Sequence, residues 1–179
     1  MGFFRIHRTQ RLIPLGGFTI IELIMVLVIL AIIGVLVMRP VSYLSQIRET
    51  AASRKLKADI RYAQSYALSS QARTRVAFDI GAAAYSFYYE SSPGVWTVMT
   101  DPLTKGNFTV NIGAAEFAGV SMSQKNFDGV SKDLVFDAAG KPYSCDGGGA
   151  SITALVNQGG ITFGGGTGVH VEPVTGKVQ

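Results

Sequence analysis

LGGFTIIELIMVLVILAIIG, residues 15–34, is an apolar stretch that contains a single acidic residue, Glu22. The apolar run extends from Phe18 to Met38, and Glu22 is its only ionisable residue. At a rise of ~1.5 Å per residue, this run forms a helix of ~31 Å, which is close to the thickness of the hydrocarbon core of a bilayer. The sequence therefore predicts that residues 18–38 cross a membrane once.

The segment ahead of this run is basic, as is typical of a targeting segment. Arg5, Arg8 and Arg11 lie there without any acidic residue, whereas residues 18–179 contain 13 basic and 12 acidic residues. The formal charge of +4 is thus weak evidence for nucleic-acid binding. A retained anchor is favoured over a secretory signal peptide, because the run is too long and VMRPVS (residues 37–42) offers no small-x-small cleavage site. Basic residues also follow the run, so charge alone leaves its orientation open.

Glu22 needs an explanation, because a carboxylate at the centre of a bilayer costs ~2.5–3.5 kcal/mol on insertion scales. One explanation is an acid in the first helical turn, stabilised by the helix dipole. The other is a carboxylate that pairs with a positive group. Cleavage between Gly17 and Phe18 would create such a group, a new α-amine one helical turn from Glu22.

GFTIIEL, residues 17–23, resembles the processing signal of type IV prepilins and type II secretion pseudopilins. The resemblance implies that residues 1–17 are a cleaved leader, that a prepilin peptidase cuts between Gly17 and Phe18, and that Phe18 is then N-methylated. It implies that Glu22 pairs with the N-terminus of a neighbouring subunit during assembly. It also implies a bacterial inner-membrane protein with a cytoplasmic leader and a periplasmic C-terminal domain. The expected partners are the peptidase, other pilin or pseudopilin subunits, an inner-membrane assembly platform and membrane lipid.

Residues 39–72 are predicted to continue the helix as an amphipathic half. Pro40 removes one helical hydrogen bond and predicts a kink. We interpret the basic side of this half as a solvated face, with contact to lipid head groups, an acidic neighbour or DNA as alternatives. That side is formed by Arg54, Lys57 and Arg61. The apolar face, at helical spacing, is formed by Ala52, Leu56, Ile60, Ala63 and Ala67.

Residues 73–179 are predicted to form a β-rich globular domain without a further helix. Strand formers cluster between turn residues in eight segments. These are RVAFDI (75–80), AYSFYYE (84–90), VWTVM (95–99), FTVNI (108–112), DLVFD (133–137), SITALV (151–156), GGITFGG (159–165) and GVHVEP (168–173). The expected fold class is therefore α+β and pilin-like: one long N-terminal helix, passing from membrane to periplasm, packed on an antiparallel sheet or two small sheets.

Two later stretches resemble the H-type minor pseudopilins and T-type minor pilins. LVFDAAGKPY (134–143) is similar to a turn segment of these proteins, and VHVEPVTGKV (169–178) is similar to their C-terminal strand. Asp137–Gly140 is predicted to be a hairpin turn. Cys145 is the only cysteine, so no internal disulfide forms; we expect it to be buried and unreactive, with pairing to another chain as the alternative. Few basic residues lie near the C-terminus, which disfavours nucleic-acid binding.

No enzymatic signature stands out. Ser144, Cys145 and Asp146 are adjacent in sequence, which does not make a catalytic triad, and His170 is expected to be exposed or structural. No metal-ligand spacing and no phosphate loop are present, so neither a metal nor a cofactor is expected. We expect a minor pseudopilin of a type II secretion pseudopilus that contributes to protein export. The alternatives are a minor type IV pilin, acting in initiation, adhesion or DNA uptake, and a membrane-anchored periplasmic binding module.

Overall fold

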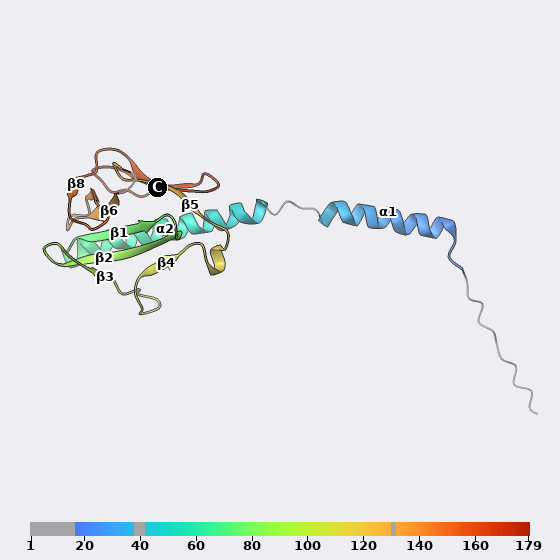
Figure 1. The fold of residues 1–179 in the computed structure, drawn as a ribbon, viewed down its shortest axis with the longest axis horizontal. Helices are drawn as coiled ribbons and strands as arrows, with labels where there is room; N and C mark the ends of the chain where they lie inside the picture. Colours follow the sequence, from blue (N-terminus) through green and yellow to red (C-terminus); the bar gives the residue numbers. More distant parts are fainter. Residues whose placement is uncertain (1–16, 38–41, 130–131) are drawn as a thin grey trace, which may run out of the picture. The chain divides into compact units, whose positions relative to one another are not determined.

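The computed structural model describes residues 17–37, 42–129 and 132–179 (Figure 1). The chain divides into two compact units, Met1–Pro40 and Val41–Gln179. The first contains helix α1 (Ile20–Val37), and the second contains helix α2 (Ser42–Ser70), all the strands and the 3-10 turn η1 (Ala115–Phe117). The predicted kink at Pro40 and most of the predicted leader lie outside the described residues. Within the described ranges, no helix is both long enough and apolar enough to cross a membrane.

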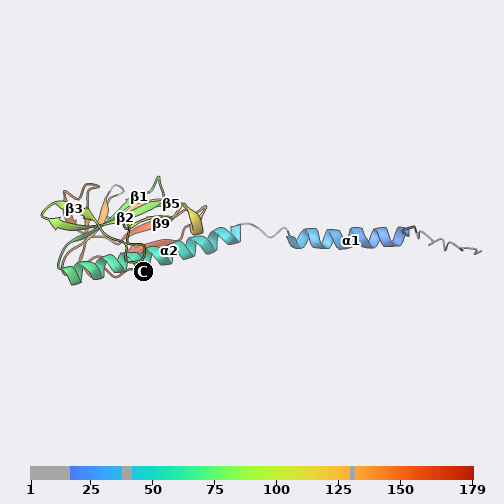
Figure 2. The same cartoon turned by 90° about the horizontal axis from the view of Figure 1, so that it is seen from below.

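Helix α2 confirms the amphipathic face predicted from the sequence. It ends at Ser70, two residues before the predicted end, where Gln71 adopts a φ of 54°. A left-handed residue at this place commonly ends a helix. The face at helical spacing is completely buried, with relative exposures of 0–1% for Ala52, Leu56, Ile60, Ala63 and Ala67. Figure 2 shows the strands gathered along one side of α2.

The strands form two antiparallel sheets, which settles the alternative left open by the sequence. The larger sheet has the order β3-β2-β1-β6-β7-β8, with β4 also paired to β2, and the smaller has the order β10-β9-β5. The larger contains β1 (Thr74–Asp79), β2 (Ala84–Ser92), β3 (Val95–Val98), β4 (Thr109–Asn111), β6 (Asp133–Phe136), β7 (Pro142–Cys145) and β8 (Ile152–Ala154). The smaller contains β5 (Met122–Asn126), β9 (Gly159–Phe163) and β10 (Gly168–Val171).

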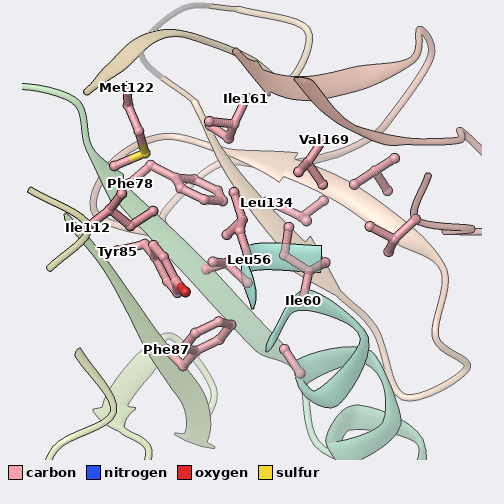
Figure 3. Packing of buried hydrophobic residues seen from close by; sticks show 14 of the residues in the cluster. Leu56, Ile60, Phe78, Tyr85, Phe87, Ile112, Met122, Leu134, Ile161 and Val169 are labelled. Atoms are coloured by element: carbon pink, nitrogen blue, oxygen red, sulfur yellow. The ribbon is translucent and has the colours of Figure 1, made fainter. Parts of the chain in front are cut away.

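Both sheets share the apolar face of α2, and the core lies between them. Val76 on β1 is aligned with Phe87 on β2 and with Leu134 on β6, and all three are fully buried. Figure 3 shows Leu56 and Ile60 of α2 packed among side chains of the larger sheet, with residues of the smaller sheet close by. Alternation along each strand therefore sends one set of side chains to α2 and the other set to the opposite face.

All eight predicted strands are present, but the sequence missed β5 and β7. Strand β5 reads MSQKN, and most of its side chains are exposed, because it is an edge strand of the smaller sheet. Strand β7 reads PYSC and begins with Pro142, a position where a missing N–H is tolerated. Neither segment has the apolar alternation that reveals a strand in sequence.

A buried ion pair joins the two sheets. Lys125 on β5 lies 2.9 Å from the Asp133 carboxylate on β6, and its side chain and that of Asp133 are 13% and 3% exposed. Lys125 Nζ also donates to the backbone carbonyl of Phe78 on β1 at 3.0 Å. The pair therefore links the two sheets, and loss of either partner would leave the other charge buried and uncompensated.

Candidate functional site

The predicted processing site lies at the start of α1. Gly17, Phe18 and Thr19 precede the helix without helical structure, and Phe18 is 84% exposed. A Cβ placed at Gly17 would meet no heavy atom within 4 Å. Packing among the described residues therefore does not require glycine at this position.

Glu22 lies in the first turn of α1, and Thr19 caps the helix ahead of it. The Thr19 hydroxyl accepts a hydrogen bond from the Glu22 backbone N–H at 3.3 Å. Thr-x-x-Glu is the capping-box pattern, a signal in TIIE that the sequence reading missed. The Glu22 side chain is exposed, and no ion pair between described residues includes it. The first-turn position is thus confirmed, whereas pairing with a neighbouring N-terminus stays a prediction.

The basic side of α2 is only partly a solvated face. Arg61 Nη2 donates to the backbone carbonyl of Val178 at 2.8 Å, which ties the helix to the C-terminal end of the chain. Arg54 is exposed and Lys57 is half-buried. The prediction of a solvated face is therefore confirmed at Arg54 and Arg61, which are both exposed, and Arg61 in addition has a structural partner that is distant in sequence.

The two late motifs that resemble minor pilins meet on α2. Asp137 closes the β6–β7 turn, because its Oδ1 accepts the backbone N–H groups of Ala139 and Lys141 at 2.9 and 2.8 Å. Gln64 on α2 then donates through Nε2 to the carbonyls of Gly140 at 2.9 Å and Thr175 at 3.3 Å. The predicted hairpin turn is confirmed, and one glutamine holds both motifs to the helix.

Glycine is required in both turns. Gly140 and Gly176 have φ values of +74° and +66°, which side chains rarely adopt. A Cβ at Gly176 would also lie 2.9 Å from the carbonyl oxygen of Gly140. The two turns therefore approach each other closely at the surface of α2, and larger residues would separate them.

Glu49 forms a structural contact that the sequence did not reveal. This acid on α2 is 7% exposed, and its carboxylate accepts the backbone N–H groups of Gly165 at 3.0 Å and Thr167 at 2.9 Å. A Cβ at Gly165 would overlap the Glu49 carboxylate. The glycine-rich connection between β9 and β10 thus packs closely around the Glu49 carboxylate and donates two hydrogen bonds to it.

Replacing Glu49 with alanine is expected to lower the free energy of unfolding by about 1–3 kcal/mol, because two backbone donors lose a charged acceptor. Urea unfolding of the full chain, followed by circular dichroism, measures the change. Glu49→Gln keeps one acceptor and is expected to lose less. Equal midpoints for wild type and Glu49→Ala would show that the contact has no energetic weight.

Ser144 and Cys145 lie in β7, and Asp146 directly follows this strand. Ser144 Oγ lies 3.0 Å from Thr153 Oγ1, and the two hydroxyls share a hydrogen bond. Cys145 is a free, buried thiol, as predicted. Its burial, with a smaller contribution from the charge of Asp133, raises the pKa of Cys145 to about 11. A thiol with this pKa is a poor nucleophile at neutral pH.

Cys145 is expected to react with iodoacetamide at least ~100-fold more slowly in the folded chain than in urea. The pKa of the thiol rises from 9.0 to about 11, which lowers the thiolate fraction at pH 7.5 by about 100-fold, and burial slows access further. Raising the pH toward 10 should speed the reaction of the folded chain. Intact-mass analysis over time measures the rates, and rapid labelling without urea would contradict the burial.

No group of three or more His, Cys, Asp and Glu side chains that could hold a metal ion occurs among residues 17–37, 42–129 and 132–179. His170 on β10 is exposed. Its backbone N–H and carbonyl bond to Gln179, which closes a C-terminal hairpin.

Two solved structures resemble the fold of this chain. Neither a protein-family model nor a curated protein matches it. The minor pseudopilin EpsH of the Vibrio cholerae type 2 secretion system matches with a TM-score of 0.52 and 11% identity, over 74% of this chain and 94% of EpsH. The type IV minor pilin FimU of Pseudomonas aeruginosa gives 0.41 and 14%, over 76% of this chain and 90% of FimU. The likeness to EpsH shows that the chain has a pilin-like fold.

Proposed function

We propose that the chain is a minor pseudopilin, a subunit of a type II secretion pseudopilus that contributes to protein export. The observation that carries the proposal is the start of α1: the Gly17–Phe18 bond directly precedes an apolar helix with one acid, Glu22, which has no ion-pair partner among the described residues. The pilin-like fold of the chain supports it. In this proposal a prepilin peptidase cuts after Gly17 and methylates Phe18, and the chain itself has no catalytic role.

The apolar side chains of α1 support a helix that is surrounded by lipid or by other apolar helices. The apolar residues Ile20, Ile21, Leu23 and Ile24 are between 49% and 82% exposed. A helix that is apolar on all sides needs lipid or other apolar helices around it. We propose that residues 18–38 hold the subunit in the inner membrane, with residues 1–17 in the cytoplasm, until the assembly platform transfers it to the filament.

Glu22 would then act during that transfer. In the proposed filament, the α1 helix of each subunit is surrounded by the α1 helices of other subunits. The new amine of Phe18 therefore enters apolar surroundings. A charge that is buried alone is costly, and an opposite charge from a neighbour removes most of that cost. Glu22 has no partner among the described residues of its own chain, so its carboxylate is available for the Phe18 amine of the next subunit.

A clean deletion in the native host tests the assignment. Secreted proteins and sheared surface pili are quantified in the deletion strain and after complementation with the wild-type gene. Loss of secreted proteins with intact pili is the expected result. Loss of pili with intact secretion would instead assign the chain to the minor type IV pilins, whose late motifs it also resembles. A chain that keeps its leader and affects neither would be an anchored binding module.

A further inference from the structure

The sequence contains two Asp-Gly pairs, Asp128–Gly129 after β5 and Asp146–Gly147 after β7. In such a pair the backbone nitrogen of the glycine can attack the side-chain carboxyl carbon of the aspartate, because glycine has no Cβ to shield it. Ring closure forms a C–N bond and releases one water, which gives a succinimide. Hydrolysis then consumes one water and breaks either C–N bond of the ring, which gives aspartate or isoaspartate. The reaction therefore requires a carboxyl group and a glycine nitrogen that are free to meet.

The fold holds both reacting groups of Asp128–Gly129. The Asp128 carboxylate accepts the backbone N–H of Val156 at 2.6 Å and that of Asn157 at 3.1 Å. It also accepts the side-chain amide of Asn157 at 3.0 Å. The Gly129 N–H donates to Asn126 Oδ1 at 3.0 Å. Attack at Asp128 would thus first break several hydrogen bonds, and those to the ionised carboxylate are of the stronger kind.

The reacting groups of Asp146–Gly147 are not held in this way. Both residues are exposed, and among the described residues the Asp146 carboxylate has no hydrogen bond and no ion pair. The Gly147 N–H likewise donates to no acceptor in the part of the chain that the structure describes. A Cβ at Gly147 would meet nothing within 4 Å, so the space beside the nitrogen is open. The carboxyl group can therefore turn toward the Gly147 nitrogen without giving up a partner.

We propose that Asp146 is a site of spontaneous isoaspartate formation, while the fold protects Asp128. The Gly147 nitrogen of the chain itself is the nucleophile, and water is the only co-reactant. The proposal is independent of the proposed function, because it uses only the β domain.

The modification would act on a buried arginine. Isoaspartate adds one atom to the main chain between Asp146 and Gly147, which shifts the loop that follows β7. In that loop the Gly147 carbonyl accepts from Arg75 Nη1 at 3.2 Å, and the Gly149 carbonyl accepts from Trp96 Nε1 at 3.4 Å. Arg75 is 7% exposed, and its Nε is buried without an acceptor. Loss of the Gly147 contact would leave the guanidinium without a hydrogen bond among the described residues, so we expect the modified chain to unfold at a lower urea concentration.

The purified full chain in detergent is incubated at neutral pH, in one sample folded and in another unfolded in guanidinium chloride. Isoaspartate is quantified by labelling with protein isoaspartyl methyltransferase and located by electron-transfer fragmentation of peptides, because the mass does not change. In the folded sample we expect Asp146 to convert at least about tenfold faster than Asp128, since attack at Asp128 requires the loss of charge-assisted hydrogen bonds. In the unfolded sample the two aspartates should convert at similar rates.

Two glycine variants test the attacking nitrogen. Gly147→Ala places a Cβ beside this nitrogen and should remove most of the isoaspartate at Asp146. Gly148→Ala is the matched control, because it makes the same substitution one residue later and should leave the rate unchanged. Neither glycine has a left-handed φ, and a Cβ at either position meets nothing within 4 Å, so both variants should fold. Equal rates at Asp146 and Asp128 in the folded chain, reaction of Asp146 only after unfolding, or an unchanged rate in Gly147→Ala would each overturn the proposal.

Discussion

Replacing Gly17 with alanine is expected to leave the chain uncleaved, with the processed fraction reduced by about 10- to 200-fold. A single added methyl group is worth about 1–3 kcal/mol when an enzyme pocket excludes it. The fold itself should not respond, since a Cβ at Gly17 would meet no heavy atom within 4 Å. The effect would therefore come from the peptidase. Immunoblots of the native host, which separate the precursor from the shorter mature chain, measure the processed fraction.

Gly34→Ala is the matched control. It makes the same substitution in the same unit, at a position where a Cβ also meets nothing within 4 Å. Normal processing of Gly34→Ala together with the block in Gly17→Ala would place the glycine requirement at the cleavage site. If both variants were processed at the wild-type rate, Gly17 would have no role in cleavage.

Replacing Glu22 with alanine is expected to leave cleavage intact and to reduce incorporation into the filament by more than ~100-fold. Removing one partner of a buried pair costs about 3–5 kcal/mol, because the other charge stays buried and unpaired. Thr19 still caps α1 in the variant, since its hydroxyl accepts the backbone N–H of residue 22. Cleavage is read from immunoblots of membranes, and incorporation is read from sheared filaments.

Two further variants separate charge from shape. Glu22→Gln keeps the size and hydrogen-bonding groups of the side chain, so it should fail almost as completely as Glu22→Ala. Glu116→Ala removes an exposed acid from η1 in the β domain and should assemble normally. Normal incorporation of Glu22→Ala would refute the charge-pairing mechanism while leaving the fold and the processing site untouched.

The apolar face of α2 could be predicted because helical periodicity is a local property of the sequence. Ala52, Leu56 and Ile60 recur at intervals of four, and all three are buried. Most of the strands could be predicted for the same reason, because alternation of apolar residues is also a local property and reflects one buried face. Strand β5 lacks this signal, because an edge strand with mostly exposed side chains has no reason to alternate.

The polar contacts could not be predicted from the sequence, since they join residues that are far apart in the chain. Glu49 reaches Gly165, Gln64 reaches Thr175, and Arg75 reaches Gly147. Each of these side chains is ordinary in its local sequence, and its role depends on which loop the fold brings opposite to it. Asp137 is the exception, because a turn closed by its own aspartate is a local motif.

The candidate processing site was predicted from sequence alone, because its residues lie within one short segment. The structure adds the open position of Gly17, the exposure of Phe18 and the cap formed by Thr19. The partner of Glu22 belongs to another subunit in this account, so a single chain does not contain it.

The N-terminal peptide of the chain, isolated from membranes of the native host and identified by mass spectrometry, tests the central claim most directly. We predict a peptide that begins at Phe18 and carries one methyl group on its α-amine. A mature protein that still begins at Met1, or one cut elsewhere with a free amine, would contradict the account.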